Sequence, residues 1–284
     1  MTDSTEPSSA MPRAARRRKG RTNAPARVGL AQLPWGQPRY LDAPIEPLDA
    51  EGIDKIHNAA MRILEEIGID FLHDDAREIL ARAGCDVKKD SVTVRMDRAL
   101  VMEQVAKAPK RIVMTPRNPD RALVFGETYA AFGLVSSPPN VSDLDHGRRV
   151  GNRTDYQNLL KLAQSFECIH FTGGYPVEPV DLHPSIRHLD CLFDLLTLTD
   201  KLVHAYSLGV ERVEDAMAMV RIAAGLDQEA FEQVPRMFTN INSSSPLKHD
   251  WPMLDGAMRL ARHNQLVIIT PFTLAGAMAP ITLV

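Results

Sequence analysis

The chain has 284 residues, of which 44% are hydrophobic and 24% are charged, a composition typical of a globular protein with a sizeable core. Residues 1–42 hold eight basic and three acidic residues, and the remainder holds 25 basic and 33 acidic residues, a net charge of −8. Because this acidic body would repel phosphate backbones, it argues against nucleic-acid binding.

The cysteines and the hydropathy pattern favour a cytoplasmic protein. Cys85, Cys168 and Cys191 are scattered and form no CxxC pair, which argues against a disulfide framework and a cysteine-built metal site. No apolar run reaches the roughly 18 residues of a membrane-spanning helix. The basic N-terminus is not followed by the apolar core of a secretory signal. We therefore expect no membrane association.

Residues 1–40 are rich in Ser, Pro, Ala and Arg and carry few large apolar groups. Such a segment cannot bury enough surface to offset its chain entropy, so we predict a disordered basic tail. The basic run at residues 16–19 could contact RNA, anionic lipid or an acidic partner. A solvated tail is the simpler interpretation.

Residues 41–150 are predicted to form an α+β region. Apolar residues at helical spacing predict a helix over 50–67, which Asp49 caps and Gly68 closes. Further patterns predict helices at 74–83 and 97–108, and strands at 92–94, 111–115, 121–125 and 128–135, the last three as an antiparallel patch.

Residues 151–284 repeat one unit: a short β-branched run, a polar or Gly/Pro loop, and an amphipathic helix. The runs start 34, 35 and 29 residues apart, a spacing typical of a parallel βα array. The predicted strands are 168–172, 202–207, 237–241 and 266–270. A capping box of Thr154 and Gln157 begins one predicted helix, and further helices are predicted at 184–199, 211–224 and 252–263.

This rhythm predicts an α/β fold, a partial TIM-type (β/α) barrel that is preceded by the α+β N-terminal region. Residues 151–284 would form the truncated first half of this barrel. No strand is followed by a glycine-rich dinucleotide loop, which disfavours a doubly wound sheet. Periodicity alone leaves a flavodoxin-like open sheet as the alternative.

The loops after the predicted strands hold the candidate site, because in βα barrels these loops carry the chemistry. Asn242, Ser243 and Ser244 place small polar groups there, although Asn and Ser also favour ordinary N-cap turns. Tyr175 and Phe272 offer aromatic faces suited to a methylated ammonium ion, although aromatic residues near strand ends are often core.

Familiar catalytic and metal-binding motifs are absent. The sequence contains no HExxH, GxSxG, P-loop or calcium loop, so no catalytic residue is assigned and no metal site is expected. His170 and His204 lie in predicted strands and could point into a barrel, but structural roles for histidines are commoner than ligation. Glu178 and Asp181 could act as acid or base, or cap the next helix.

Four segments carry a resemblance to a known family: residues 60–68, 143–149, 242–247 and 271–282. In these segments the chain resembles the trimethylamine methyltransferase family, (β/α) barrel proteins that move a methyl group from a methylamine to a corrinoid protein. The resemblance covers roughly residues 45–284. Members are close to twice this length, so the chain resembles their N-terminal portion.

The resemblance implies transfer of a methyl group from trimethylamine, or from a quaternary amine such as glycine betaine, to the cobalt of a cognate corrinoid protein. The cobalamin would arrive on that partner rather than bind this chain directly. Some members carry pyrrolysine at a position that would lie beyond Val284. The resemblance also implies a homo-oligomer, with Tyr175, Asn242, Ser243, Ser244 and Phe272 as substrate-binding candidates. The alternative is a catalytically incomplete fragment or an interaction protein of the same fold.

Overall fold

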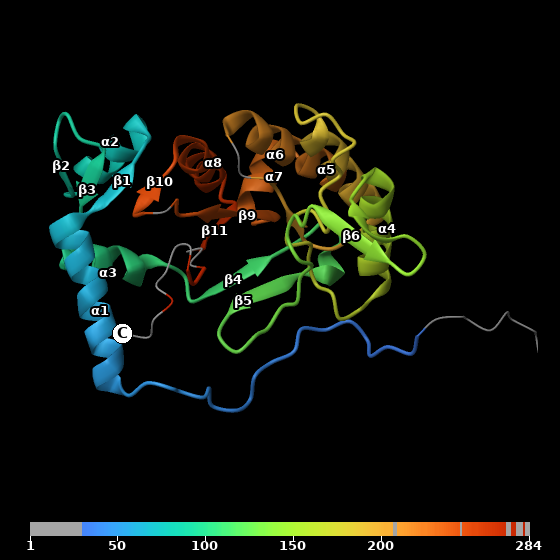
Figure 1. Ribbon diagram of the computed structural model, residues 1–284, viewed down its shortest axis with the longest axis horizontal. Coiled ribbons are helices and arrows are strands. Elements are labelled where there is room, and N and C mark those ends of the chain that lie inside the picture. Colours follow the sequence, from blue (N-terminus) through green and yellow to red (C-terminus); the bar gives the residue numbers. More distant parts are fainter. Residues whose placement is uncertain (1–29, 207–208, 245, 271–273, 277–280, 282–284) are drawn as a thin grey trace, which may run out of the picture. The chain divides into compact units, whose positions relative to one another are not determined.

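The computed structural model describes residues 30–206, 209–244, 246–270, 274–276 and 281 (Figure 1). The chain divides into two compact units, residues 1–32 and 33–284, and the fold below is that of the second. Its helices and helical turns are α1 (Ala50–Arg62), η1 (Ile63–Ile67), α2 (Asp74–Arg82), α3 (Arg98–Lys107), η2 (Pro119–Arg121), α4 (Arg153–Ser165), α5 (Arg187–Leu198), α6 (Val210–Ala224), α7 (Gln228–Gln233) and α8 (Trp251–Arg262). Its strands are β1 (Ile69–Phe71), β2 (Asp86–Val87), β3 (Thr93–Arg95), β4 (Arg111–Met114), β5 (Leu123–Gly126), β6 (Asn140–Asp143), β7 (Gly147–Val150), β8 (Val203–His204), β9 (Met237–Asn242), β10 (Lys248–His249) and β11 (Leu266–Thr270).

The first helix has the ends that the sequence predicts. The Asp49 side chain accepts a hydrogen bond from the Gly52 N–H at 2.8 Å. The helical segment ends at Gly68, whose φ of +87° and close approach to Val94 exclude a side chain. The predicted apolar face is not core, however, because Ile53 and Ile56 are 52% and 60% exposed.

The N-terminal region and the loop after β9 share one sheet, in the order β10-β1-β3-β2. Strand β1 pairs in parallel with β10 and antiparallel with β3. Strands β4 and β5 form the predicted antiparallel pair. The predicted strand at 128–135 is wrong, because only Tyr129 and Gly133 make isolated bridges there.

The predicted parallel βα array is confirmed within the described residues. Strand β8 pairs in parallel with β9, and β9 with β11, while single parallel bridges join Gly133 to Phe171 and Phe171 to Leu202. The strand segments are therefore added in chain order, and a helix lies between each consecutive pair in the sequence. The reversal of strand order that defines a doubly wound sheet does not occur among these segments. They form no closed barrel in the described part of the chain.

Both faces of this parallel sheet are covered, as expected for βα units. Neighbouring side chains of β9 alternate between the two faces: Met237 belongs to the cluster beneath the helices, and Phe238 to the cluster facing the β4–β5 hairpin. We call these the helix face and the hairpin face. The hairpin face is closed by residues from β4 and β5 such as Met114 and Leu123, which are fully buried.

Residues 33–40, which the sequence places in the tail, contact the hairpin. Both ends of the Gln37 amide bond the backbone of Val124, with Nε2 at 2.9 Å from its oxygen and Oε1 at 2.7 Å from its nitrogen. The Trp35 ring packs against the hairpin-face cluster. These contacts give the segment a partly buried apolar side chain and a backbone partner, which an unfolded tail lacks.

A buried cation, Lys201, stands just before β8. It is 2% exposed, and its Nζ donates hydrogen bonds to the carbonyl oxygens of Ala163 and Phe166 at the end of α4. Burial and the nearby Arg121 guanidinium lower the pKa of Lys201 to about 8. In the unfolded chain the pKa returns towards its ordinary value of 10.5.

We expect the protein to become more stable as the pH rises above 8. Between the folded and unfolded pKa values of Lys201 the unfolded chain holds a proton that the folded chain has released, so raising the pH favours folding. From pH 7.5 to 9.5 the contribution of Lys201 to the free energy of unfolding should grow by about 2 kcal/mol, measured by urea denaturation as the difference in pH slope between the natural sequence and K201M. The variant K201M should lose this rise, whereas K161M, at an exposed position on α4, should keep it. Equal pH slopes for K201M and the natural sequence would contradict the assignment.

Candidate functional site

The carboxyl ends of the parallel strand segments carry three side chains of interest. Tyr175 follows the segment around Phe171, Tyr206 follows β8, and Asn242 ends β9. Because the strands run in parallel and pair in register, these ends lie on one edge of the sheet, where βα folds place their ligands.

The glycines before Tyr175 fix its loop against the neighbouring segment. A Cβ on Gly173 would lie 2.3 Å from the carbonyl oxygen of Leu134, and one on Gly174 would lie 2.3 Å from the Oγ of Ser136. The Ser137 N–H donates to the carbonyl oxygen of Tyr175 at 2.6 Å. The pair of glycines therefore permits a close backbone approach that positions Tyr175.

Tyr175 lines a cavity together with Tyr206. Two hollows, with volumes of about 20 and 100 Å³, share Tyr175, His188, Tyr206 and Arg212 as lining residues. The two tyrosine rings stack with centroids 5.1 Å apart and planes at 26°. Burial raises the pKa of both phenols, so they stay neutral and can donate a hydrogen bond.

The charged and titratable residues around this cavity differ in whether they contact a carboxylate. Arg187 donates to the Glu178 carboxylate at 2.5 Å and to the Leu182 carbonyl oxygen at 2.8 Å. His188 contacts Asp215 at 2.9 Å. Arg212 forms no ion pair or hydrogen bond with any residue that the structure describes.

The other predicted site residues lie elsewhere on the same edge or cannot be placed. The Asn242 N–H donates to the Sδ of Met253 at 3.3 Å, and the backbone of Ser244 pairs with Lys248 in a tight turn leading to β10. Neither Asn242 nor Ser243 and Ser244 line the cavity around Tyr175. Phe272 lies outside the described residues.

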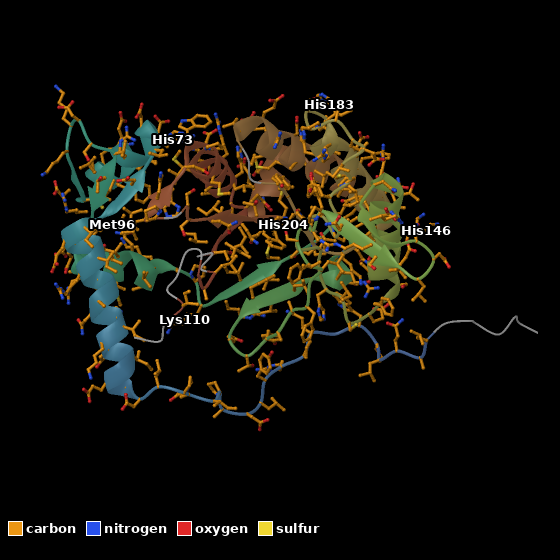
Figure 2. The ribbon with its side chains drawn as sticks, in the orientation of Figure 1. His73, Met96, Lys110, His146, His183 and His204 are labelled. Atoms are coloured by element: carbon orange, nitrogen blue, oxygen red, sulfur yellow. The ribbon has the colours of Figure 1, made fainter. Side chains whose placement is uncertain are left out.

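The two strand histidines differ in their surroundings. His170 is 1% exposed, and its Nδ1 accepts the Phe132 N–H at 2.9 Å, so it has the structural role that is common for histidine. His204, labelled in Figure 2, meets the Phe238 ring edge to face at 5.0 Å. Neither ring nitrogen of His204 has a hydrogen-bond partner among the described residues, and burial lowers its pKa to about 4.

Sequence reasoning missed Tyr206, His188 and Arg212 as cavity residues. Tyr206 falls inside a predicted strand, next to its end, so its position could have marked it. Arg212 is in the first turn of a helix, where the helix dipole favours acidic side chains, and this mismatch was an available signal. His188 carries no such signal.

No group of three or more His, Cys, Asp or Glu residues in the described part of the chain stands close enough to hold a metal ion. No helix in that part of the chain combines the length and the apolar character needed to cross a membrane.

The ordered parallel strands, with helices between them, define a protein of the βα-array class with a cavity at its strand-end loops. The chain belongs to the trimethylamine methyltransferase (MTTB) family, which it matches over residues 13–284.

Two relatives show how the chain compares with characterised members. It is 34% identical over 236 residues to a glycine betaine methyltransferase of Desulfitobacterium hafniense strain Y51, covering 83% of this chain and 49% of the relative. It is 25% identical over 238 residues to the trimethylamine methyltransferase MttB of Desulfitobacterium hafniense strain DSM 10664 / DCB-2, covering 82% of this chain and 47% of the relative. The chain thus spans about half the length of these curated relatives.

Proposed function

We propose that the protein transfers a methyl group from a methylated amine to the cobalt of a corrinoid protein, with glycine betaine as the favoured donor. Family membership and the name of the relative that is 34% identical support this reaction. The observation that carries the proposal is the cavity at the carboxyl edge of the parallel sheet, where the stacked rings of Tyr175 and Tyr206 suit a methylated ammonium ion.

The chemistry places few demands on acid–base groups. When methyl transfer breaks the bond between carbon and a quaternary nitrogen, the electron pair stays on nitrogen and a neutral tertiary amine leaves without a proton. A cobalt(I) corrinoid, carried by the partner protein, supplies the nucleophile that accepts the methyl group. This chain would hold the amine in line and exclude water.

The same proposal extends to the fold, the docking of the partner, the cellular location and the oligomeric state. We assign the parallel strand segments to a TIM-type (β/α) barrel, because strands added in chain order with intervening helices are the arrangement of that fold. The corrinoid protein would dock over the strand ends. We further propose a cytoplasmic homo-oligomer, on the dispersed cysteines and on the family resemblance.

Mixing the protein, at its full natural length, with cob(I)alamin and glycine betaine should produce a time-dependent change in the cobalt absorbance, and dimethylglycine should accumulate in step. Trimethylamine should be tested in parallel, and a reaction without protein sets the background rate. Absence of transfer from every methylated amine would overturn the proposal.

Self-association in that case would favour the alternative of an interaction protein. Ile269 on the edge strand β11 is 67% exposed and offers an apolar edge for such contacts. Sedimentation of the same sample measures the self-association, and the methyl-transfer assay distinguishes the two hypotheses.

A further inference from the structure

The cavity around Tyr175 is lined by one cation, Arg212, that has no ion pair among the described residues. Arg187 forms an ion pair with Glu178, and the Nε2 of His188 lies 2.9 Å from the Asp215 carboxylate. Arg212 lines both hollows and contacts no carboxylate among the described residues.

The position of Arg212 does not stabilise helix α6. It is in the first turn of α6, where the positive end of the helix dipole repels a guanidinium. A half-buried arginine with five donors and no acceptor among the described residues is a natural binding partner for a carboxylate, which it can bind with two parallel hydrogen bonds.

Part of the cavity wall is aromatic, and Leu192, Leu195 and Glu178 are among the other lining residues. Tyr206 stacks on Tyr175, and Tyr156 meets Tyr175 edge to face at 5.7 Å. A quaternary ammonium ion has no N–H to donate, so it binds through the faces of such rings rather than through hydrogen bonds. The cavity thus combines a surface for a methylated cation with one unpaired site for an anion.

We propose that Arg212 binds the carboxylate of a zwitterionic quaternary-ammonium substrate whose methylated nitrogen lies against the wall formed by Tyr175 and Tyr206. This assignment rests on the proposed function and narrows it to carboxylate-bearing donors. Arg212 is then a specificity-determining residue that discriminates these donors from amines lacking a carboxylate.

Calorimetric titration with three probes tests the assignment without methyl transfer. Glycine betaine carries both groups, choline carries the quaternary ammonium but no carboxylate, and trimethylamine lacks the carboxylate and the fourth substituent. We expect glycine betaine to bind about tenfold or more tightly than choline, because a charge-assisted bidentate pair contributes at least that factor.

Variants separate the carboxylate contact from general damage to the fold. R212Q should weaken glycine betaine binding about tenfold or more and leave choline binding unchanged, and R212K should recover part of the loss. R221Q, in the last turn of the same helix and away from the cavity, is the matched control and should bind as the natural sequence does. Y206L should weaken both ligands, whereas Y206F should keep choline binding.

The outcomes distinguish the two proposals. Equal binding of glycine betaine and choline, or an R212Q variant that binds glycine betaine normally, would overturn the role of Arg212 and leave the methyltransferase proposal standing. Arg212-dependent binding without methyl transfer to cob(I)alamin would retain the role of Arg212 and overturn the reaction. Failure of all three probes to bind would overturn the role of Arg212.

Discussion

Replacing Arg153 by methionine is expected to lower the free energy of unfolding by about 3 kcal/mol. Arg153 begins α4 and donates to both carboxylate oxygens of Asp194 on α5, at 2.8 and 3.1 Å. The Asp194 side chain is 5% exposed, so removing its partner leaves a buried charge with too little compensation. Methionine keeps much of the apolar stem of arginine, and the loss therefore reports the charge. Urea denaturation at neutral pH measures it.

Two further variants make this result specific. R148M, at an exposed position in β7 with no ion pair among the described residues, should change stability by less than about 0.5 kcal/mol. Combining R153M with D194L should recover much of the loss, because two apolar side chains can replace a buried ion pair. An R153M variant as stable as R148M would show that the contact between α4 and α5 does not depend on this pair.

Replacing Gly173 by alanine should destabilise the fold by about 3 kcal/mol or more. The added Cβ would lie 2.3 Å from the backbone oxygen of Leu134, which cannot move without displacing the segment that carries the bridge between Gly133 and Phe171. The same displacement would shift Tyr175 two residues later, so glycine betaine binding should weaken as well. Thermal unfolding and calorimetric titration measure the two effects.

The matched control for this variant is G36A. A Cβ on Gly36 meets nothing within 4 Å, so its cost should stay within about 0.5 kcal/mol. If G173A matched G36A in both stability and ligand binding, the close approach would not hold the cavity together.

The starts and ends of several elements could be predicted because their causes are local. Asp49 caps α1, Asp97 caps α3 through the N–H groups of Ala99 and Leu100, and Gly68 supplies a positive φ. The parallel strands were also predictable, since strand and helix periods alternate along the sequence. These features depend on neighbours within a few residues, which a sequence displays directly.

The capping box of α4 shows where local rules become ambiguous. The sequence offered Thr154 and Gln157, but in the structure Asn152 and Asp155 cap each other reciprocally. The Asp155 carboxylate also pairs with Arg149 from β7. Both pairs fit the motif, and a contact from another element determines which one forms.

The sequence by itself determined the βα rhythm, the ends of several helices and the family to which the chain belongs. Only the tertiary structure decided that Tyr175, Tyr206 and Arg212 line one cavity while Asn242 is not among its lining residues. It also decided that Ile53 and Ile56 stay exposed and that Trp35 is packed against the core. The physical reason is that periodicity encodes which face of an element is apolar, whereas the partner that covers that face comes from a distant segment whose position no local pattern specifies.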